Sequence, residues 1–240
     1  MSNRKSILPS LGPLTTLGVM ATLFDLTDEH YVLSGIHTAH AALSRGDIVV
    51  VPTDTVYGLA VCPRVEGSIE RLVGVKGRGL DMAPPILVSG IDQADALVAD
   101  DALTGDLAAA LKLLWPGALT IVLPINPALD FSVGDTPGTI ALRAPNQPEL
   151  LELLRIHGPL AVTSANLTGQ PPCQNISQAI NIFGDDVSVY LNAGSESGTN
   201  HEPSTIIDAT SLGNNGAVSI IRPGAISASA LVDAGLEVAS

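Results

Sequence analysis

Three successive valines at residues 49–51 predict a short buried strand, and Pro52 ends it. Residues 53–57 then supply two threonine hydroxyls, a carboxylate and a phenol. Polar groups directly after a buried strand predict that the strand ends at a functional surface. The rest of the chain must fold so that this surface is completed by other segments.

The length and composition of the chain favour one α/β domain. Its 240 residues suffice for a full core, and hydrophobic residues make up 46% of them but aromatic residues only 3%. Such a core is built from Val, Ile, Leu and Ala, which favours a sheet covered by helices. We expect a flexible lead-in at residues 1–20, a single catalytic domain at 21–226 and a tail at 227–240, with Met20 as a second candidate start.

Apolar periodicity and turn residues predict alternating helices and strands, and hence helices packed on a mixed sheet. The expected helices lie near residues 33–43, 68–75, 92–98, 103–114, 146–156 and 177–183, with a short one after 226. The expected strands lie near residues 47–51, 86–88, 119–123, 139–143, 160–162, 187–191, 204–208 and 217–221. Ser34 is the expected cap of the first helix, and Asn146 with Glu149 forms an expected capping box.

The charge of the chain limits the partners that it can bind. A formal net charge of −13 argues against binding nucleic acid by neutralising phosphates, so we expect no strong direct binding of nucleic acid. Four of the eleven Lys and Arg residues nevertheless fall in or beside turns rich in Gly, Ser and Thr. These are Lys76, Arg78, Arg143 and Arg222. Scarce positive charge gathered at turns predicts a small anionic ligand.

Cysteine usage and hydropathy indicate the compartment. Cys62 and Cys173 are too few for a disulfide framework, and no Cys or His spacing resembles a zinc site. Pro, Gly and Thr interrupt the apolar segment at residues 7–24, which is too broken to span a bilayer. We therefore expect a cytoplasmic protein without a membrane anchor.

The missing motifs restrict the chemistry. The chain has no Walker A loop, dinucleotide-binding glycine motif, nucleophile elbow or zinc-protease motif, and none of its five histidines adjoins a candidate nucleophile. Cations and small polar groups remain, which is what phosphoryl or adenylyl transfer needs. Lys76 and Arg78 are flanked by glycines, which let the backbone approach a ligand while both cations face it.

Polar side chains lie at the ends of five expected strands. They are Thr53 and Thr55, Arg143, Ser164 and Asn166, Ser204 at a strand start, and Arg222. Ligands of α/β sheets bind in the crevice beyond strand ends, so we expect these groups to converge.

Seven short motifs together resemble one family. They are residues 51–59 (VPTDTVYGL), 76–78 (KGR), 115–120 (WPGALT), 143–146 (RAPN), 163–169 (TSANLTG), 203–208 (PSTIID) and 222–224 (RPG). In this order they resemble the threonylcarbamoyl-AMP synthases of the YrdC or TsaC type, across roughly residues 34–226.

The resemblance implies a fold, a reaction and partners. The fold is a twisted mixed β-sheet with flanking helices around a concave cavity. The enzyme is a nucleotidyltransferase that makes L-threonylcarbamoyl adenylate and pyrophosphate from L-threonine, bicarbonate or carbon dioxide, and ATP, with Mg²⁺. The product serves the threonylcarbamoyladenosine modification of tRNA, through a downstream threonylcarbamoyl transferase complex. The metal ligands are not indicated.

The resemblance also implies site residues. Thr55, Arg143, Ser164 and Ser204 correspond to threonine-binding residues; Arg78, Thr139, Asn166 and Arg222 correspond to ATP-binding ones; Lys76 and Arg78 are the expected catalytic cations; Thr53 and Tyr57 are expected in the cavity wall. The chain departs from the family pattern at Gly79, Met82-Ala83, Ser89 and Gln174, all at expected nucleotide contacts or near them.

Each residue also has a structural interpretation. Thr53 and Thr55 could be ordinary strand residues, Tyr57 a core aromatic, and Asn166 only a turn residue. Trp115 and Pro116 are read as packing and helix termination, and Asp54 and Asp208 as exposed turn carboxylates more readily than metal ligands. The competing functions are a non-catalytic RNA-binding module of the same fold and a related carbamoyl-transfer protein.

Overall fold

The computed structural model describes residues 14–16, 21–77, 79, 83–103, 105–194, 202–212 and 216–239. In these residues eleven strands form one mixed sheet in the order β1-β2-β9-β3-β4-β8-β5-β7-β6-β10-β11. The strands are β1 (Leu14–Thr16), β2 (Thr22–Asp25), β3 (Val49–Val51), β4 (Gly58–Val61), β5 (Ile86–Leu87), β6 (Leu119–Pro124), β7 (Thr139–Arg143), β8 (Leu160–Ser164), β9 (Val189–Asn192), β10 (Thr205–Asp208) and β11 (Ser219–Arg222). The mixed α/β fold is therefore confirmed.

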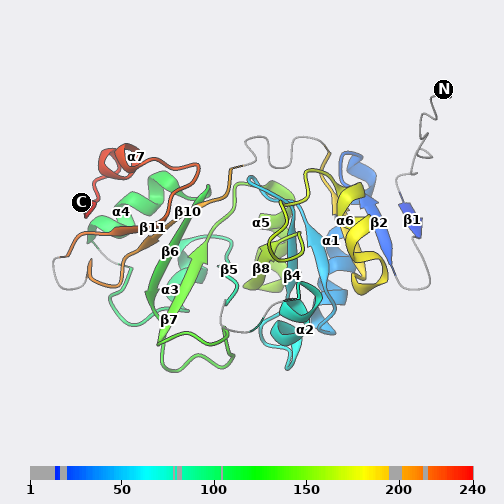
Figure 1. The fold of residues 1–240 in the computed structure, drawn as a ribbon, viewed down its shortest axis with the longest axis horizontal. Helices are drawn as coiled ribbons and strands as arrows, with labels where there is room; N and C mark the ends of the chain where they lie inside the picture. The colour runs from blue at the N-terminus through cyan, green and yellow to red at the C-terminus, as the bar shows by residue number, and fades with distance from the viewer. Residues whose placement is uncertain are drawn as a thin grey trace.

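Helices flank this sheet along its length (Figure 1). They are α1 (Glu29–Ser44), α2 (Ser68–Val75), α3 (Ile91–Asp95), α4 (Gly105–Leu114), α5 (Pro148–His157), α6 (Ile176–Phe183) and α7 (Ala228–Asp233). Figure 1 shows α4 and α7 beside β6, β10 and β11 in one half, and α1 and α5 beside β4 and β8 in the other, where α6 lies beside β2.

In the half of the sheet that contains β3, both faces are buried. Val49 and Val51 pack in a cluster with residues of α1 and α5, whereas Val50 packs in the second, larger cluster. Successive side chains of a strand point to opposite faces, so a strand buried on both sides shows no alternation of polar and apolar residues. This is why β3 has three valines in a row.

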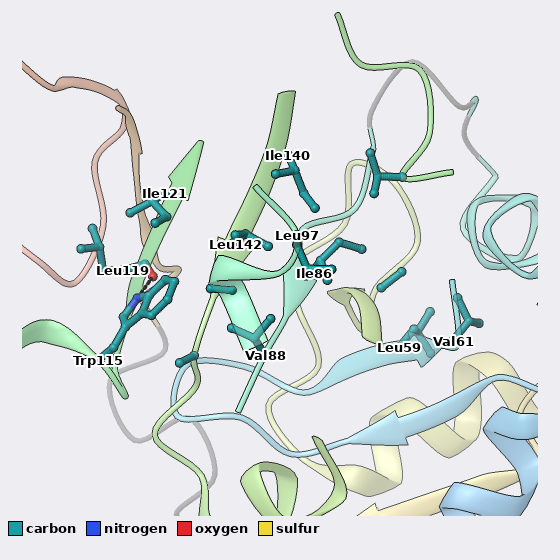
Figure 2. Packing of buried hydrophobic residues seen from close by; sticks show 14 of the residues in the cluster. Leu59, Val61, Ile86, Val88, Leu97, Trp115, Leu119, Ile121, Ile140 and Leu142 are labelled. Carbon is teal, nitrogen blue, oxygen red and sulfur yellow. Dashed lines mark hydrogen bonds between the residues drawn. The ribbon is translucent and has the colours of Figure 1, made fainter. Parts of the chain in front are cut away.

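In the other half, one face of the sheet is only partly covered. Ile140 and Leu142 of β7 are core residues, while Thr139 and Ala141 on the opposite face are half-buried. Figure 2 shows the core side, where Leu119 and Ile121 lie near Trp115, and Leu142 and Ile140 lie farther along the same cluster. The face opposite to this core carries Thr139, Ala141 and Arg143, and it forms one wall of the candidate site.

The elements expected from the sequence agree best where the periodicity is regular. The helix expected at residues 68–75 and the strand at 139–143 have the predicted bounds. Two caps were wrong. Asp28 caps α1, because this helix begins five residues before Ser34. Gln147 lies at the cap position of α5 without a side-chain cap bond, so the Asn146 capping box does not form.

The expected lead-in and the expected tail both contain residues that join the sheet or the core. Residues 14–16, within the expected lead-in, form β1 and pair antiparallel with β2. In the expected tail, Leu231 and Leu236 are buried in the core and Val238 forms a bridge with Val218. None of the described helices combines the length and apolar character needed to cross a bilayer.

Candidate active site

The loop between β3 and β4 is held together by the hydroxyl of Thr53. This oxygen accepts the backbone N–H groups of Thr55 and Val56 at 3.1 Å each, and it donates to the carbonyl of Val56 at 2.6 Å. The two threonine hydroxyls are 3.0 Å apart, and both side chains are buried. Thr53 therefore fixes the loop from within and sets the direction of the Thr55 hydroxyl.

Arg143, at the end of β7, reaches this loop. Its Nη1 donates to the hydroxyl of Thr55 at 2.9 Å, and its Nη2 forms an ion pair with the Asp54 carboxylate at 2.5 Å. Its Nε donates to the carbonyl of Gly117 at 3.0 Å. Each nitrogen of the guanidinium thus has one protein acceptor, and Asp54 is a partly buried ion-pair partner rather than the exposed turn carboxylate that we expected.

The charge of Arg143 is held in a buried place. Burial lowers the pKa of its guanidinium, the nearby positive charge of Arg222 lowers it further, and Asp54 acts in the opposite direction. An arginine stays protonated in proteins despite such a shift. The site therefore presents a fixed cation that is suited to a carboxylate.

Gly117 connects Arg143 to the core. Its N–H donates to the carbonyl of Ala144 at 2.8 Å, and a Cβ at this position would lie 2.4 Å from the carbonyl oxygen of Leu114. Trp115 is buried and donates from Nε1 to the carbonyl of Leu119 at 2.8 Å, the bond drawn in Figure 2. Trp115 is thus a packing residue, as expected, and α4 ends just before it.

A second cation, Lys76, ends α2 and is buried. Its ammonium donates to the main-chain carbonyl of Ser164 and lies 3.3 Å from Oδ1 of Asn166. The Ser164 hydroxyl donates to the same Oδ1 at 2.5 Å, while Nδ2 of Asn166 donates to the carbonyls of Leu167 and Gln170. Lys76, Ser164 and Asn166 therefore form one hydrogen-bonded group.

A third cation, Arg222 at the end of β11, contacts Ser204. Its Nη2 donates to the Ser204 carbonyl at 2.6 Å and to the hydroxyl at 3.1 Å, and that hydroxyl is 2.8 Å from the hydroxyl of Thr120. The turn after Arg222 presses on this segment, because a Cβ on Gly224 would lie 2.3 Å from the carbonyl oxygen of Pro203. Burial lowers the pKa of Arg222.

The group around Arg143 and Thr55 and the group around Lys76 and Ser164 are adjacent in the sheet. Gly58, which follows the Thr53 loop, pairs with Ser164, and the N–H of Ala165 donates to the carbonyl of Tyr57 at 2.7 Å. Tyr57 has no exposed surface, and its hydroxyl donates to Oδ1 of Asn192 at 3.1 Å. Tyr57 is therefore a buried aromatic beneath the loop, and its expected place in the cavity wall stays a prediction.

The strand directions do not place all of these groups on one edge of the sheet. β7 and β11 run antiparallel to β3 and β8, so Arg143 and Arg222 lie at the opposite edge from Thr55 and Ser164. Adjacent strands of a sheet rotate by roughly 20–25° each, so twist accumulates over the strands that separate the two groups. The contact between Arg143 and Thr55 joins the two edges, and convergence therefore depends on this twist and on the loop, not on a shared edge.

The other expected residues are less closely joined. Thr139 is at the far end of β7 from Arg143, on the same face of the sheet and about 13 Å away at the usual rise per residue. Arg78 and Met82 lie outside the described residues. The backbone N–H of Ser89 donates to Oε1 of Gln93 at 2.9 Å, and Ser89 lines a concavity with Trp115 rather than belonging to the groups above.

Sequence reasoning missed Asp54 and Thr120 as members of the site. Asp54 lies in the expected motif, but its pairing with Arg143 is a contact between positions far apart in the chain. Asp208, the second carboxylate considered, accepts bonds from the N–H and hydroxyl of Thr210. Among the described residues, no group of three His, Cys, Asp or Glu side chains is placed to hold a metal ion.

The family model for Sua5, YciO and YrdC proteins, which carries the description "Telomere recombination", matches residues 41–224. The chain belongs to this family. The resemblance inferred from the seven motifs is thereby confirmed, and the shared region includes every site residue named above.

Named relatives agree with this membership. A Mycobacterium tuberculosis protein, provisionally named a threonylcarbamoyl-AMP synthase, is 36% identical over 222 residues, covering 92% of this chain and 99% of the relative. The threonylcarbamoyl-AMP synthase of Klebsiella pneumoniae is 32% identical over 172 residues, covering 71% and 89%. These relatives do not favour the RNA-binding or carbamoyl-transfer alternatives.

Solved structures share the fold. The P. abyssi Sua5 structure complexed with L-threonine superposes with a TM-score of 0.73 and 26% identity, covering 85% of this chain and 58% of that longer chain. The E. coli YciO structure superposes with a TM-score of 0.69 and 20% identity, covering 82% and 92%.

Proposed function

We propose that the protein is an L-threonylcarbamoyladenylate synthase. It converts L-threonine, bicarbonate and ATP into L-threonylcarbamoyl adenylate, pyrophosphate and water. The observation that carries this proposal is the contact of Arg143 with Thr55 and Asp54, because it sets a buried cation beside a fixed hydroxyl within the family's longest motif. The named relatives and the L-threonine complex of Sua5 support the same assignment.

Threonine would bind between the two edges of the sheet. Arg143 is suited to its carboxylate, since a guanidinium pairs with a carboxylate through two parallel N–H donors. Thr55, Ser164 and Ser204 would supply hydroxyls to the rest of the amino acid. All three are already ordered by hydrogen bonds, so little side-chain freedom is lost on binding.

ATP would bind along the partly covered face of the sheet. Arg222 is suited to phosphate oxygens, Asn166 and Thr139 to hydrogen-bonding parts of the nucleotide, and Arg78 to the phosphates as well. Proteins commonly hold Mg²⁺ by one or two carboxylates together with substrate phosphates. We propose that Mg²⁺ would be held mainly by the phosphates of ATP and would supply neutralisation of part of their charge, together with Arg78 and Arg222.

The reaction needs positioning and charge neutralisation more than covalent catalysis. The threonine amine adds to the carbon of bicarbonate, with loss of water, or to carbon dioxide, with loss of a proton, to give a carbamate. A carbamate oxygen then attacks the α-phosphorus, and the bond to the β-phosphate breaks to release pyrophosphate. Lys76 and Arg78 would stabilise the charge on the phosphate oxygens as it redistributes. Lys76 is suited to this because its ammonium is already directed by Ser164 and Asn166.

The product would serve the threonylcarbamoyladenosine modification of tRNA. We propose that it passes in the cytoplasm to a downstream threonylcarbamoyl transferase complex, and that this chain itself does not bind RNA strongly. RNA binding that weakens steeply with salt and has micromolar affinity would contradict the last point, since such a slope reports phosphate neutralisation.

Omission of single substrates tests the proposal. Purified protein with Mg²⁺ is given ATP, L-threonine and bicarbonate, and pyrophosphate release is followed with a coupled assay. Release is expected only when all three substrates are present. Release that is independent of threonine would show that the substrate assignment is wrong, and no release under any condition would contradict the activity as a whole.

A further inference from the structure

The Asp54 carboxylate is distinguished by the residue that it contacts. In the described part of the chain it is the only carboxylate in contact with any of the proposed threonine-binding residues. Its side chain is 15% exposed and that of Arg143 is 7% exposed, so a small ligand could reach the pair while bulk water is largely excluded. The chemistry proposed above gives Asp54 no role.

The α-amino acid that Arg143 would bind carries two charges on one carbon. If the α-carboxylate pairs with the guanidinium, the α-ammonium lies beside it and needs an acceptor, because an unpaired charge in a buried place is costly. Asp54 lies within one hydrogen bond of the same guanidinium. The buried pair therefore offers a positive charge for the α-carboxylate and, beside it, a negative charge for the α-ammonium of an amino-acid zwitterion.

The neighbouring groups leave this role to Asp54. Thr55 and Ser164 offer only neutral hydroxyls, which cannot balance the charge of an ammonium. The other charged group that acts on Arg143, Arg222, is a cation and would repel an ammonium. The net charge of the pair is zero, so a neutral zwitterion can enter without leaving an excess of either sign.

We infer that Asp54 is a specificity-determining residue that binds the α-ammonium group of the substrate amino acid. The ion pair of the free protein is then exchanged for two, Arg143 with the α-carboxylate and Asp54 with the α-ammonium. This inference rests on the proposed function, because it takes a free α-amino acid as the ligand of Arg143. It predicts that hydroxy acids without an amino group are poor ligands.

Two ligands test this inference on the full-length protein. L-threonine and (R)-3-hydroxybutyrate differ only by the amino group, and calorimetry measures the binding of each without turnover. Wild-type protein should bind L-threonine at least about 10-fold more tightly than (R)-3-hydroxybutyrate, because the free energy of a hydrogen bond to a charged group corresponds to about this ratio of affinities. Equal affinity for both ligands would overturn the inference without any variant.

The substitution Asp54→Asn keeps the shape and removes the charge. It should weaken L-threonine binding by about 10- to 100-fold while leaving (R)-3-hydroxybutyrate binding unchanged or tighter. If Asp54 only holds Arg143 in place, both ligands lose the same factor, and the inference is overturned. Asp47→Asn is the matched control, because Asp47 pairs with Arg45 on the surface at 2.8 Å and should change neither affinity.

The same experiment separates this inference from the proposed function. Suppose that wild-type protein releases pyrophosphate only with threonine while Asp54→Asn weakens the binding of L-threonine and of (R)-3-hydroxybutyrate by the same factor. In that case only the role of Asp54 is wrong. If wild-type protein binds no L-threonine and releases no pyrophosphate, both proposals fall.

Discussion

The ammonium of Lys76 lies 3.3 Å from the side-chain oxygen of Asn166 and also donates to the carbonyl of Ser164. Asn166 is in turn fixed by two bonds from its own amide to the carbonyls of Leu167 and Gln170. The charge at the end of α2 is therefore aimed by the turn that follows β8.

Replacing Lys76 should remove this directed charge. Lys76→Met is expected to reduce pyrophosphate release by about 100-fold or more, as loss of one preorganised donor does in other enzymes. Arg78→Ala should have an effect in the same direction. Steady-state kinetics measures both, with circular dichroism to verify folding. Lys112→Met, an exposed position of α4, is the control, and activity that survives in the folded Lys76 and Arg78 variants would remove the proposed role of these cations.

Thr53 should matter for stability through its hydroxyl. Thr53→Val keeps the shape but leaves two backbone N–H groups of the buried loop without an acceptor. Each unsatisfied group costs about 1–3 kcal/mol, so the free energy of unfolding should fall by at least that amount in urea titrations. Thr38→Val, whose hydroxyl bonds only within α1, should change it by about 0.5 kcal/mol or less. Equal effects of the two substitutions would be inconsistent with the role of Thr53.

The turn after Arg222 should tolerate no side chain at Gly224. A Cβ there would lie 2.6 Å from the Ser204 carbonyl carbon, so Gly224→Ala must move the turn that sets Arg222 on Ser204. The KM for ATP should rise about 10-fold, the cost of one weakened charged hydrogen bond. Gly74→Ala in α2 meets no atom within 4 Å and should leave the KM unchanged. A normal KM for ATP in the Gly224 variant would contradict the proposed contact.

Stability should decrease in mild acid through His157. Burial, with help from His40 and Arg64, lowers the pKa of His157 to about 4, and its Nδ1 is 3.0 Å from Nδ1 of His40. Below about pH 6.5 the unfolded chain binds a proton that the folded one does not, so stability is full above that pH and falls as pH decreases toward 4. Urea titrations across this window should show the fall.

The His157→Gln variant should show a smaller dependence on pH than the wild type over the same range. His30→Gln, at a side chain that is 91% exposed, should behave as the wild type does. An unchanged pH dependence in the His157 variant would assign the effect to other groups.

Local pattern predicted the regular elements, and the missed ones have physical reasons. β4 begins at Gly58 and contains only one β-branched residue, Val61, and because it is buried on both faces it shows no alternation either. The start of α1 was placed too late because its first turn, from Glu29, has exposed and half-buried residues that do not reveal helical periodicity.

The site was predictable as a set of residues but not as an arrangement. Ser164 and Asn166 share one turn, so their proximity follows from sequence. The pairing of Arg143 with Asp54 depends on how a mixed sheet twists between β3 and β7, and the spacing of residues along the chain carries no information about it.

Product analysis tests the central claim most directly. Purified protein is incubated with ATP, L-threonine, Mg²⁺ and bicarbonate labelled with carbon-13, and the nucleotide products are separated by mass spectrometry. The account predicts L-threonylcarbamoyl adenylate, heavier by one mass unit than the product from unlabelled bicarbonate. AMP without this adduct, or an adduct that carries no label, would contradict it.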